Sequence, residues 1–193
     1  MSQGDRAEAK RRAGESAAEA VDDGMIVGLG SGSTAAAAIR SIAREVDAGL
    51  DVQGIPTSFQ ARELACEGDV PLTTLDETDG QVDLAIDGAD QFAGPDLVKG
   101  GGGAHAREKV VDLAADRLLV VADPIKEVDV LDCPVPLEVL PDARTTAADA
   151  VRRLGGTPDL RMAHPVAGRR PRRSSARRAT PPAGRGSRVR RPP

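Results

Sequence analysis

No stretch of this 193-residue chain approaches the roughly 18 consecutive apolar residues that a membrane-spanning helix requires. The first twenty residues also have no apolar core, so we expect no secretory signal there. Cysteine is nearly absent: Cys66 and Cys133 lie far apart without metal-ligand spacing, which indicates reduced thiols. These absences predict a cytoplasmic protein with no membrane partner.

Lysine is scarce. Residues 1–160 contain only four lysines, and their 15 basic residues face 30 acidic ones, a net charge of −15. Many carboxylates with few lysines suit a protein that works in concentrated salt, where repulsion between carboxylates is screened. Each remaining lysine is therefore a better candidate for a functional residue. The four are Lys10, Lys99, Lys109 and Lys126.

Acidic residues are missing from the end of the chain. Residues 161–193 contain 11 arginines but no acid, lysine or aromatic residue. A segment of this composition cannot bury a core, so we expect residues 162–193 to be disordered. Two origins are open, a basic arm that binds nucleic acid or the product of a reading-frame shift in a GC-rich gene. We favour the frameshift, because the arginine-rich segment interrupts a small domain shortly after its first residues. We therefore expect no nucleic-acid partner.

The rest of the chain alternates amphipathic helices with short apolar strands. We expect helices over 5–22, 34–46 and 58–67 and from near Gly103 to about Ala115, with strands over 25–30, 52–56, 71–75, 82–87 and 117–122. Thr57 and Gln60 form an expected capping box before the third helix. The alternation predicts an α/β fold with a doubly wound, mostly parallel, Rossmann-like sheet, in which the strand over 117–122 is buried.

The sequence pattern changes beyond Pro124. Residues 133–141 are expected to form a strand and residues 143–156 a helix, the start of an incomplete small α+β domain. The predicted organisation is therefore an α/β catalytic domain over 1–128, a truncated small domain over 129–161 and the basic tail over 162–193.

Every unusual loop follows a predicted strand, and ligands bind at the carboxyl ends of the strands in such sheets. GSGST at 30–34 offers backbone N–H groups and hydroxyls at a helix start, which is typical of a phosphate site. It is not the dinucleotide fingerprint, because Ser33 stands where that motif needs glycine. A plain strand-to-helix turn is the alternative for this loop.

Two further loops carry charged groups. DGAD places Asp87 and Asp90 just past a strand, where they could cap a turn or bind a ligand; with no histidine or third acid nearby, we expect no metal. In KGGGGAHAREK a glycine run separates Lys99 from Glu108, which we place on the second turn of the following helix. A glycine run lets the backbone pass close to a ligand, although a linker is the alternative. His105 is expected to be a loop or helix-start residue.

These loops together supply the groups that a small phosphosugar isomerase needs. They are a phosphate-binding loop, two aspartates, a lysine and a glutamate, without a nucleotide fingerprint. An aldose–ketose conversion moves a proton between adjacent carbons through an enediolate. It requires a carboxylate base and a cationic or N–H-rich group for the developing oxyanion.

Seven stretches carry a specific resemblance to a known family. GLGSGSTA, IPTSFQA, DLAIDGADQ, LVKGGGGAHAREK, VVADPIKEVDVL, CPVPLEVLPDAR and LGGTPDLR, in this order, resemble type A ribose-5-phosphate isomerase over about residues 5–161. The resemblance implies interconversion of D-ribose 5-phosphate and D-ribulose 5-phosphate in the non-oxidative pentose phosphate pathway, with no metal or other cofactor. It also implies a homodimer or homotetramer.

The resemblance also implies roles. Glu108 matches the proton-shuttling base and Lys99 the lysine beside the oxyanion, while Asp87 and Asp90 match aspartates that bind sugar hydroxyls and assist ring opening. Lys126 and Lys10 match phosphate-side lysines. The full set of implied substrate-binding residues is Ser31, Gly32, Ser33, Thr34, Asp87, Gly88, Ala89, Asp90, Lys99, Gly100, Gly101, Gly102, Lys126 and Lys10.

The chain departs from the family at Gln91, where glutamate is usual, and throughout the text after Arg161. The rival function is a non-catalytic sugar-phosphate sensor. The chain shows no helix-turn-helix segment, and it keeps Glu108 and Lys99, which binding alone does not need. An enzyme is therefore the favoured interpretation.

Overall fold

A computed structural model describes residues 2–161 of the chain. The chain divides into two compact units, Met1–Arg144 and Thr145–Pro193, which are described separately. The predicted disorder and origin of residues 162–193 lie outside the described residues. The domain limits inferred from the sequence stay a prediction.

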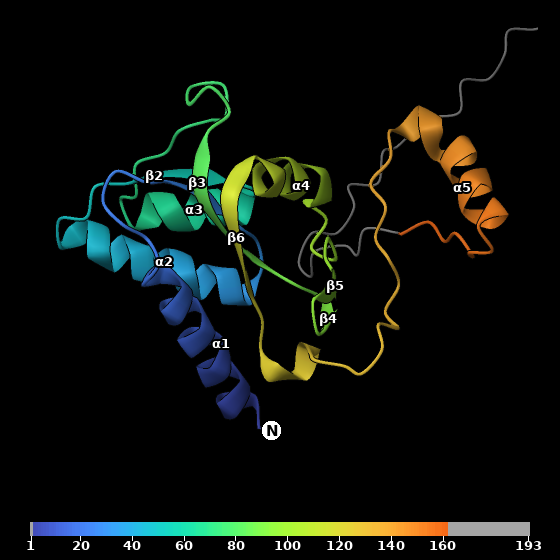
Figure 1. Cartoon of the computed structure of the whole chain (residues 1–193), viewed down its shortest axis with the longest axis horizontal. Coiled ribbons are helices and arrows are strands. Elements are labelled where there is room, and N and C mark those ends of the chain that lie inside the picture. Colours follow the sequence, from blue (N-terminus) through green and yellow to red (C-terminus); the bar gives the residue numbers. More distant parts are fainter. Residues whose placement is uncertain (1, 162–193) are drawn as a thin grey trace, which may run out of the picture. The chain divides into compact units, whose positions relative to one another are not determined.

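A four-stranded parallel sheet forms the centre of the first unit (Figure 1). Its strands are β1 (Ile26–Leu29), β2 (Gln53–Pro56), β3 (Val82–Gly88) and β6 (Ala115–Val121), in the order β2-β1-β3-β6. The expected parallel α/β fold is confirmed. The chain runs outward from β1 to β2 and then returns to the other side of β1. The strand order therefore reverses between β1 and β3, which opens a ligand crevice at their carboxyl ends.

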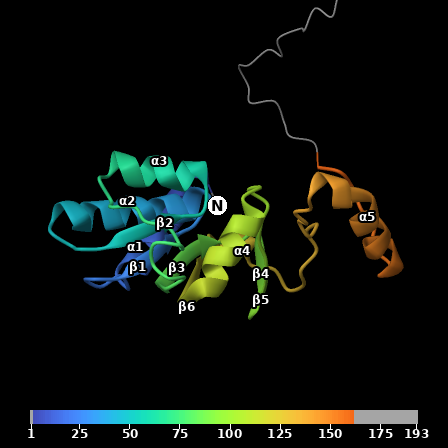
Figure 2. The ribbon, with the colours of Figure 1, turned by 90° about the horizontal axis from the view of Figure 1, so that it is seen from above.

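Helices cover both faces of the sheet (Figure 2). One face packs on α1 (Gln3–Ala18), α2 (Ser33–Asp47) and α3 (Phe59–Glu67), and the other meets α4 (His105–Ala114). Successive strand residues point to opposite faces, so β1 and β3 supply both. The core of the first face includes Val27, Leu29, Leu84 and Ile86. On the second face Val111 packs with Ile55, and a Cβ on Gly28 of β1 would meet both Val111 and Ala85 of β3.

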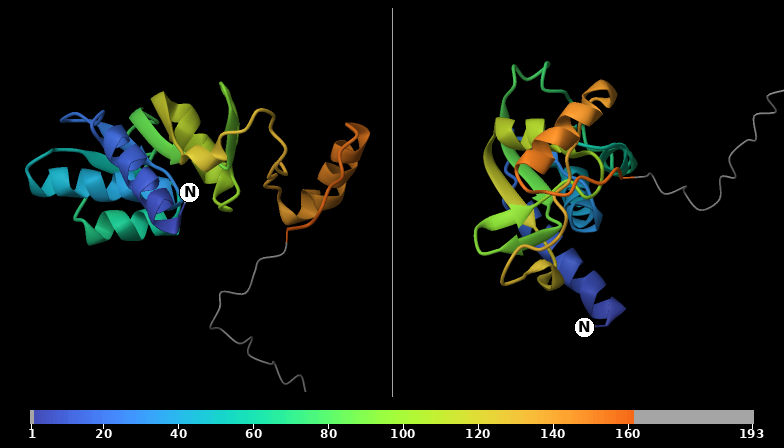
Figure 3. Two further views of the ribbon diagram at one scale, coloured as in Figure 1. Left: turned by 90° about the horizontal axis from the view of Figure 1, so that it is seen from below. Right: turned by 90° about the vertical axis from the view of Figure 1, so that its right-hand side faces the viewer.

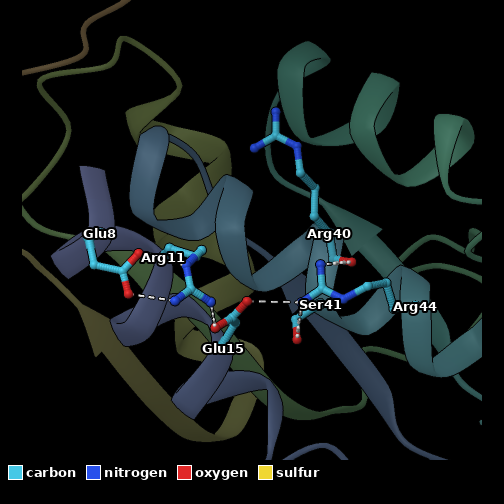
Figure 4. Close-up of polar contacts among 6 residues, drawn as sticks. All are labelled: Glu8, Arg11, Glu15, Arg40, Ser41 and Arg44. Atoms are coloured by element: carbon cyan, nitrogen blue, oxygen red, sulfur yellow. Dashed lines mark hydrogen bonds and ion pairs between the residues drawn. The ribbon is translucent and has the colours of Figure 1, made fainter. Parts of the chain in front are cut away.

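Helix α1 lies across α2 (Figure 3). The close approach depends on Gly14, where a Cβ would meet the backbone of α2 at Ala38 N, 2.6 Å away. Charged side chains join the outer sides of the two helices (Figure 4). Arg11 pairs with Glu8 and Glu15 within α1, and Glu15 also accepts from Arg44 of α2 at 3.1 Å.

Two predictions around β2 are wrong in detail. Residues 71–75 form no strand, but Leu72 makes an isolated parallel bridge to Gly54, because only Pro71 O and Thr73 N reach β2 before the chain turns away. The capping box at Thr57 is also absent. Ser58 caps α3 instead, because Thr57 is buried at the end of β2, where it donates its hydroxyl to Leu29 O.

The last strand and a short hairpin also differ from expectation. β6 was expected to be buried but forms the sheet edge, so Leu118 and Val120 stay 39% and 37% exposed. The hairpin of β4 (Gln91–Ala93) and β5 (Asp96–Val98) was not predicted, because three-residue strands carry too little periodicity to be seen. It follows β3 directly and bridges to Glu127 through Phe92.

Residues 129–161 contain two short helices. They are the 3₁₀ turn Pro141–Ala143 and α5 (Arg144–Arg153), which confirms the predicted helix. The predicted strand over 133–141 does not form within the described residues. Pro134 and Pro136 lack the N–H donors that a strand needs, and no neighbouring strand pairs with them. No helix among residues 2–161 is long and apolar enough to cross a membrane.

Candidate active site

A cavity of about 370 Å³ lies at the carboxyl ends of β1, β3 and β6. The switch in strand order between β1 and β3 places it there. Its lining brings together every substrate-binding and catalytic residue expected from the sequence, although their roles stay predictions. Arg6, Val121, Ala122 and Asp123 complete the wall.

Asp87 is the most firmly held group of the site. It is the last residue but one of β3, and it is 1% exposed. Oδ1 accepts from the backbone N–H groups of Ser31 and Gly88 at 2.8 and 2.7 Å, and Oδ2 accepts from Lys99 Nζ at 2.6 Å. Gly30 makes this approach feasible, since a Cβ there would overlap Asp87 Oδ1 and the adjoining backbone. Asp87 therefore ties the end of β1 to Lys99.

Lys99 follows β5 directly and reaches back to the end of β3. Its ammonium donates to Asp87 Oδ2 and to Gly88 O, both at 2.6 Å. The side chain is 14% exposed, so the charge is largely shielded from solvent. Two acceptors fix the ammonium at the cavity wall.

Glu108 lies on the first turn of α4, not on the second as expected, because the helix begins at His105 instead of Gly103. His105 is therefore the helix-start residue that was predicted. Glu108 is 4% exposed and lines the cavity. Burial is the main cause that raises its pKa, and the charge of Asp87 adds to it; Lys99, the Ser31 hydroxyl and His105 act in the opposite direction. A raised pKa brings a carboxylate closer to a general base matched to neutral pH.

The glycine run bends around Asp90. Asp90 Oδ2 accepts from Gly101 N at 2.7 Å, and a Cβ on Gly101 would overlap that carboxylate. Gly100 and Gly103 have φ values of +96° and +88°, which favour glycine. The run therefore needs glycine both for its backbone conformation and for close contact with Asp90.

The cavity wall also contains hydroxyl groups and further cations. Ser31, Gly32, Ser33 and Thr34 open α2, whose N-terminal N–H groups favour an anion. Lys10 and Lys126 line the same cavity.

Asp123 organises these cations. It is 1% exposed, and its Oδ2 lies 3.2 Å from Arg6 Nε and 3.6 Å from Lys10 Nζ. Its other oxygen accepts from Ile125 N and so caps the 3₁₀ turn η1 (Pro124–Lys126), which carries Lys126 into the cavity. One buried carboxylate thus joins α1 to the loop after β6.

Sequence reasoning missed three charged residues of this region. Arg6 and Lys10 are four residues apart and share a face of α1, a signal that was available. Asp123 stands in ADPIK, a loop already placed at the ligand edge. Asp112 follows Glu108 by one helical turn, so that both carboxylates lie on one face of α4, a signal that was also available. Among residues 2–161 no group of three or more His, Cys, Asp or Glu side chains is placed to hold a metal ion.

Comparisons with known proteins indicate one family. The family model of ribose 5-phosphate isomerase A (phosphoriboisomerase A) matches residues 53–175. Ribose-5-phosphate isomerase A of Haloarcula marismortui is 64% identical over 163 residues, 84% of this chain and 71% of the relative. The protein of the same name from Natronomonas pharaonis is 63% identical over 154 residues, 80% of this chain and 68% of the relative.

Solved structures give the same result. Ribose 5-phosphate isomerase A of Methanocaldococcus jannaschii superposes with a TM-score of 0.76 at 41% identity, over 81% of this chain and 71% of that one. A D-ribose-5-phosphate isomerase in complex with phospho-erythronic acid gives a TM-score of 0.77 at 37% identity, over 81% and 70% of the two chains.

Proposed function

The chain belongs to the ribose 5-phosphate isomerase A family, and from this premise we propose how its cavity works as an active site. The protein is an aldose–ketose isomerase that interconverts D-ribose 5-phosphate and D-ribulose 5-phosphate, a reaction of the non-oxidative pentose phosphate pathway. The roles of its residues follow from their positions in the cavity.

Glu108 is the proposed base. In the forward direction its carboxylate takes the proton from C2 of the open-chain aldose. The C–H electron pair forms the C1–C2 double bond, and the carbonyl electrons move to O1 as an enediolate. Glu108 then returns the proton to C1, while O1 gains a proton and O2 loses one to become the ketone. The buried carboxylate with its raised pKa suits both directions of this transfer.

Lys99 is the proposed partner of the enediolate oxygen. Its ammonium is held by Asp87 and Gly88 O, so the charge is in place before the oxyanion forms. Gly100, Gly101 and Gly102 line the same cavity. The amides of Gly100 and Gly102 can add donors, whereas Gly101 N already donates to Asp90 Oδ2.

Two other regions bind the ends of the substrate. Asp87 and Asp90 are proposed to contact the sugar hydroxyls and assist ring opening. The phosphate is proposed to bind the hydroxyl-rich start of α2 together with Lys10 and Lys126. The support is that both lysines line the same cavity as Ser31, Gly32, Ser33 and Thr34 of the GSGST loop.

One observation carries the proposal: Glu108 and Lys99 line the same cavity as the hydroxyl-rich start of α2, Lys10 and Lys126. The test is conversion of D-ribose 5-phosphate to D-ribulose 5-phosphate by the 193-residue chain in concentrated potassium chloride. We expect Glu108→Gln to abolish turnover while substrate still binds. The matched control is Lys109→Gln, an exposed neighbour on the same helix that should keep the wild-type rate. Near-full activity of Glu108→Gln would refute the role.

The non-catalytic sensor is not favoured, since the relatives are isomerases.

We also propose that the enzyme is cytoplasmic and forms a homodimer or homotetramer. Free thiols at Cys66 and Cys133 suit a reducing compartment. The exposed apolar side chains of Leu113, Leu118 and Val120 provide a surface suited to a second subunit. Light scattering in concentrated salt measures the assembly, and a monomer at all concentrations would refute it.

A further inference from the structure

Asp112 is a buried carboxylate of α4 that the proposed reaction does not use. It follows Glu108 by four residues, so the two carboxylates share one face of the helix. Its side chain is 8% exposed, and Oδ2 lies 3.7 Å from Lys99 Nζ. In the described part of the chain, Oδ1 has no hydrogen-bond partner.

This placement is costly for a residue without a role. An amphipathic helix normally presents apolar residues to the core, as α4 does with Val111. A buried carboxylate with an unsatisfied oxygen loses its hydration without full compensation. Burial, followed by the like charge of Asp87, raises the pKa of Asp112 to about 6, even though the charge of Lys99 opposes the shift. At neutral pH the group is therefore mostly a buried anion.

The surrounding contacts indicate what the anion does. The Lys99 ammonium has three N–H donors, and two of them are given to Asp87 and Gly88 O. Both acceptors belong to the end of β3, so they hold Lys99 from one element only. Asp112 adds an attraction from α4, the helix that carries Glu108.

We propose that Asp112 is a positioning residue for the isomerase reaction, whose carboxylate holds the Lys99 ammonium in place relative to Glu108. This inference rests on the proposed function. Two elements then fix the distance between the oxyanion partner and the base: β3 through Asp87, and α4 through Asp112. Small displacements of such groups are costly to the rate, because a misplacement of about 1 Å can lower it by roughly 10²-fold.

The first test is Asp112→Asn, which keeps the shape of the side chain and removes its charge. We expect kcat to fall by roughly tenfold to a hundredfold, with a much smaller change in KM, because Lys99 acts on the oxyanion that forms after binding. Asp116→Asn is the matched control, since Asp116 is exposed just after the same helix. The control should keep both constants.

The pH profile separates positioning from simple packing. The charged groups around Glu108 are Asp87 from β3, Lys99 from the loop after β5, and His105 and Asp112 from α4. Removing the negative charge of Asp112 leaves Lys99 less compensated and lowers the pKa of Glu108. The acid limb of kcat/KM should therefore move to lower pH by about half a unit in Asp112→Asn. Asp112→Glu keeps the charge and should leave the limb at the wild-type pH.

Two results would overturn the inference. One is an Asp112→Asn enzyme with wild-type kcat, and the other is a lowered kcat with an unmoved acid limb, which indicates packing alone. A turnover-independent measurement covers a variant that fails to fold. In carbon-13 carboxyl NMR the aspartate signal that titrates near pH 6 should shift to higher pH in Lys99→Met, and an unchanged midpoint refutes the contact. A folded wild-type chain without turnover instead refutes the proposed function and leaves this coupling measurable.

Discussion

Glu108 must be ionised to take a proton, and its burial makes ionisation harder. The acid limb of kcat/KM is therefore expected at a pH above 4.5, the ordinary pKa of a glutamate side chain. Activity is lost as the pH falls through the raised pKa and recovers as it rises. A pH–rate profile on the free enzyme measures the limb directly. A limb at or below the ordinary value would mean that another group is the base or that the site is more hydrated than its 4% exposure indicates.

Asp112→Asn is expected to lower activity but to raise stability, because burying the charged carboxylate is costly. The folded chain binds a proton at Asp112 more tightly than the unfolded chain, so wild-type stability falls as the pH rises from 3.8 to about 6. Asp112→Asn avoids this loss. Its free energy of unfolding should exceed the wild-type value by about 1–3 kcal/mol above that window, and the difference should shrink toward zero below it.

Urea unfolding at about pH 4.5 and about pH 8 tests this expectation. If the variant is less active but more stable at the higher pH, the result supports a functional role for the Asp112 charge, which lowers stability. Equal differences at both pH values would assign the change to packing instead of charge.

At the residue scale, sequence patterns predicted the groups that stand in distinctive loops. Glu108, Lys99, Asp87 and Asp90 flank glycine or follow a strand, so local spacing makes them visible. Asp112 and Arg6 stand within helices, where a charge is usually solvated. Only the packing of α4 against β3 and of α1 beside the loop after β6 turns these two residues inward.

At the scale of elements, the approach of β1 to β3 depends on Gly30. A Cβ at this position would overlap Asp87 Oδ1, Ile86 O and Asp87 Cα, and strand backbone cannot move aside cheaply. Gly30→Ala should displace Asp87 from Lys99 and lower kcat/KM by roughly 10²-fold. Gly4→Ala is a matched control in an exposed helix position, where the nearest atom would lie 3.7 Å away. Steady-state kinetics on both variants measures the effect, and a fully active Gly30→Ala would show that the contact is relieved without cost.

The loop after β6 acts on α1 through Asp123. Asp123→Asn keeps a cap for the 3₁₀ turn but removes the charge that holds Arg6 and Lys10. A charge-assisted contact contributes about 1.5–3 kcal/mol, so KM for the phosphosugar should rise about tenfold or more, with a smaller change in kcat. Asp129→Asn, an exposed acid nearby, should leave KM unchanged. An unchanged KM in Asp123→Asn would place the phosphate away from these cations.

Helices and strands with a clear periodic sequence pattern were predicted. Elements that depend on pairing with a neighbouring strand were not. α2 and β3 have clear periodicity and lie close to where the sequence places them. Residues 71–75 have strand-like composition, yet the chain turns after two hydrogen bonds to β2. Residues 133–141 fail as a strand, because pairing depends on partners that composition cannot show. Likewise, the exposure of β6 depends on its edge position in the sheet.

At the scale of the whole molecule, we expect repulsion between like charges to have a large effect on stability. The full chain has a formal net charge of −4, because the 11 arginines of residues 161–193 offset the −15 of residues 1–160. The two relatives described above are 64% and 63% identical proteins of Haloarcula and Natronomonas. Repulsion among so many carboxylates destabilises the compact state in dilute buffer. At about 1 M salt the Debye length is about 3 Å, and repulsion beyond neighbouring groups is largely screened.

Stability should therefore rise with salt. We expect the thermal midpoint of the full chain to increase steadily from about 0.1 to about 2 M potassium chloride, although salt weakens the exposed Arg11 and Arg44 pairs. Those few pairs contribute little in comparison with the net charge of −15 on residues 1–160. Circular dichroism gives the midpoint, and replacing the exposed Glu63, Asp76 and Asp116 by lysine should raise it at low salt and flatten its salt dependence. A midpoint that falls with added salt would mean that ion pairs, and not repulsion, govern the stability of this acidic chain.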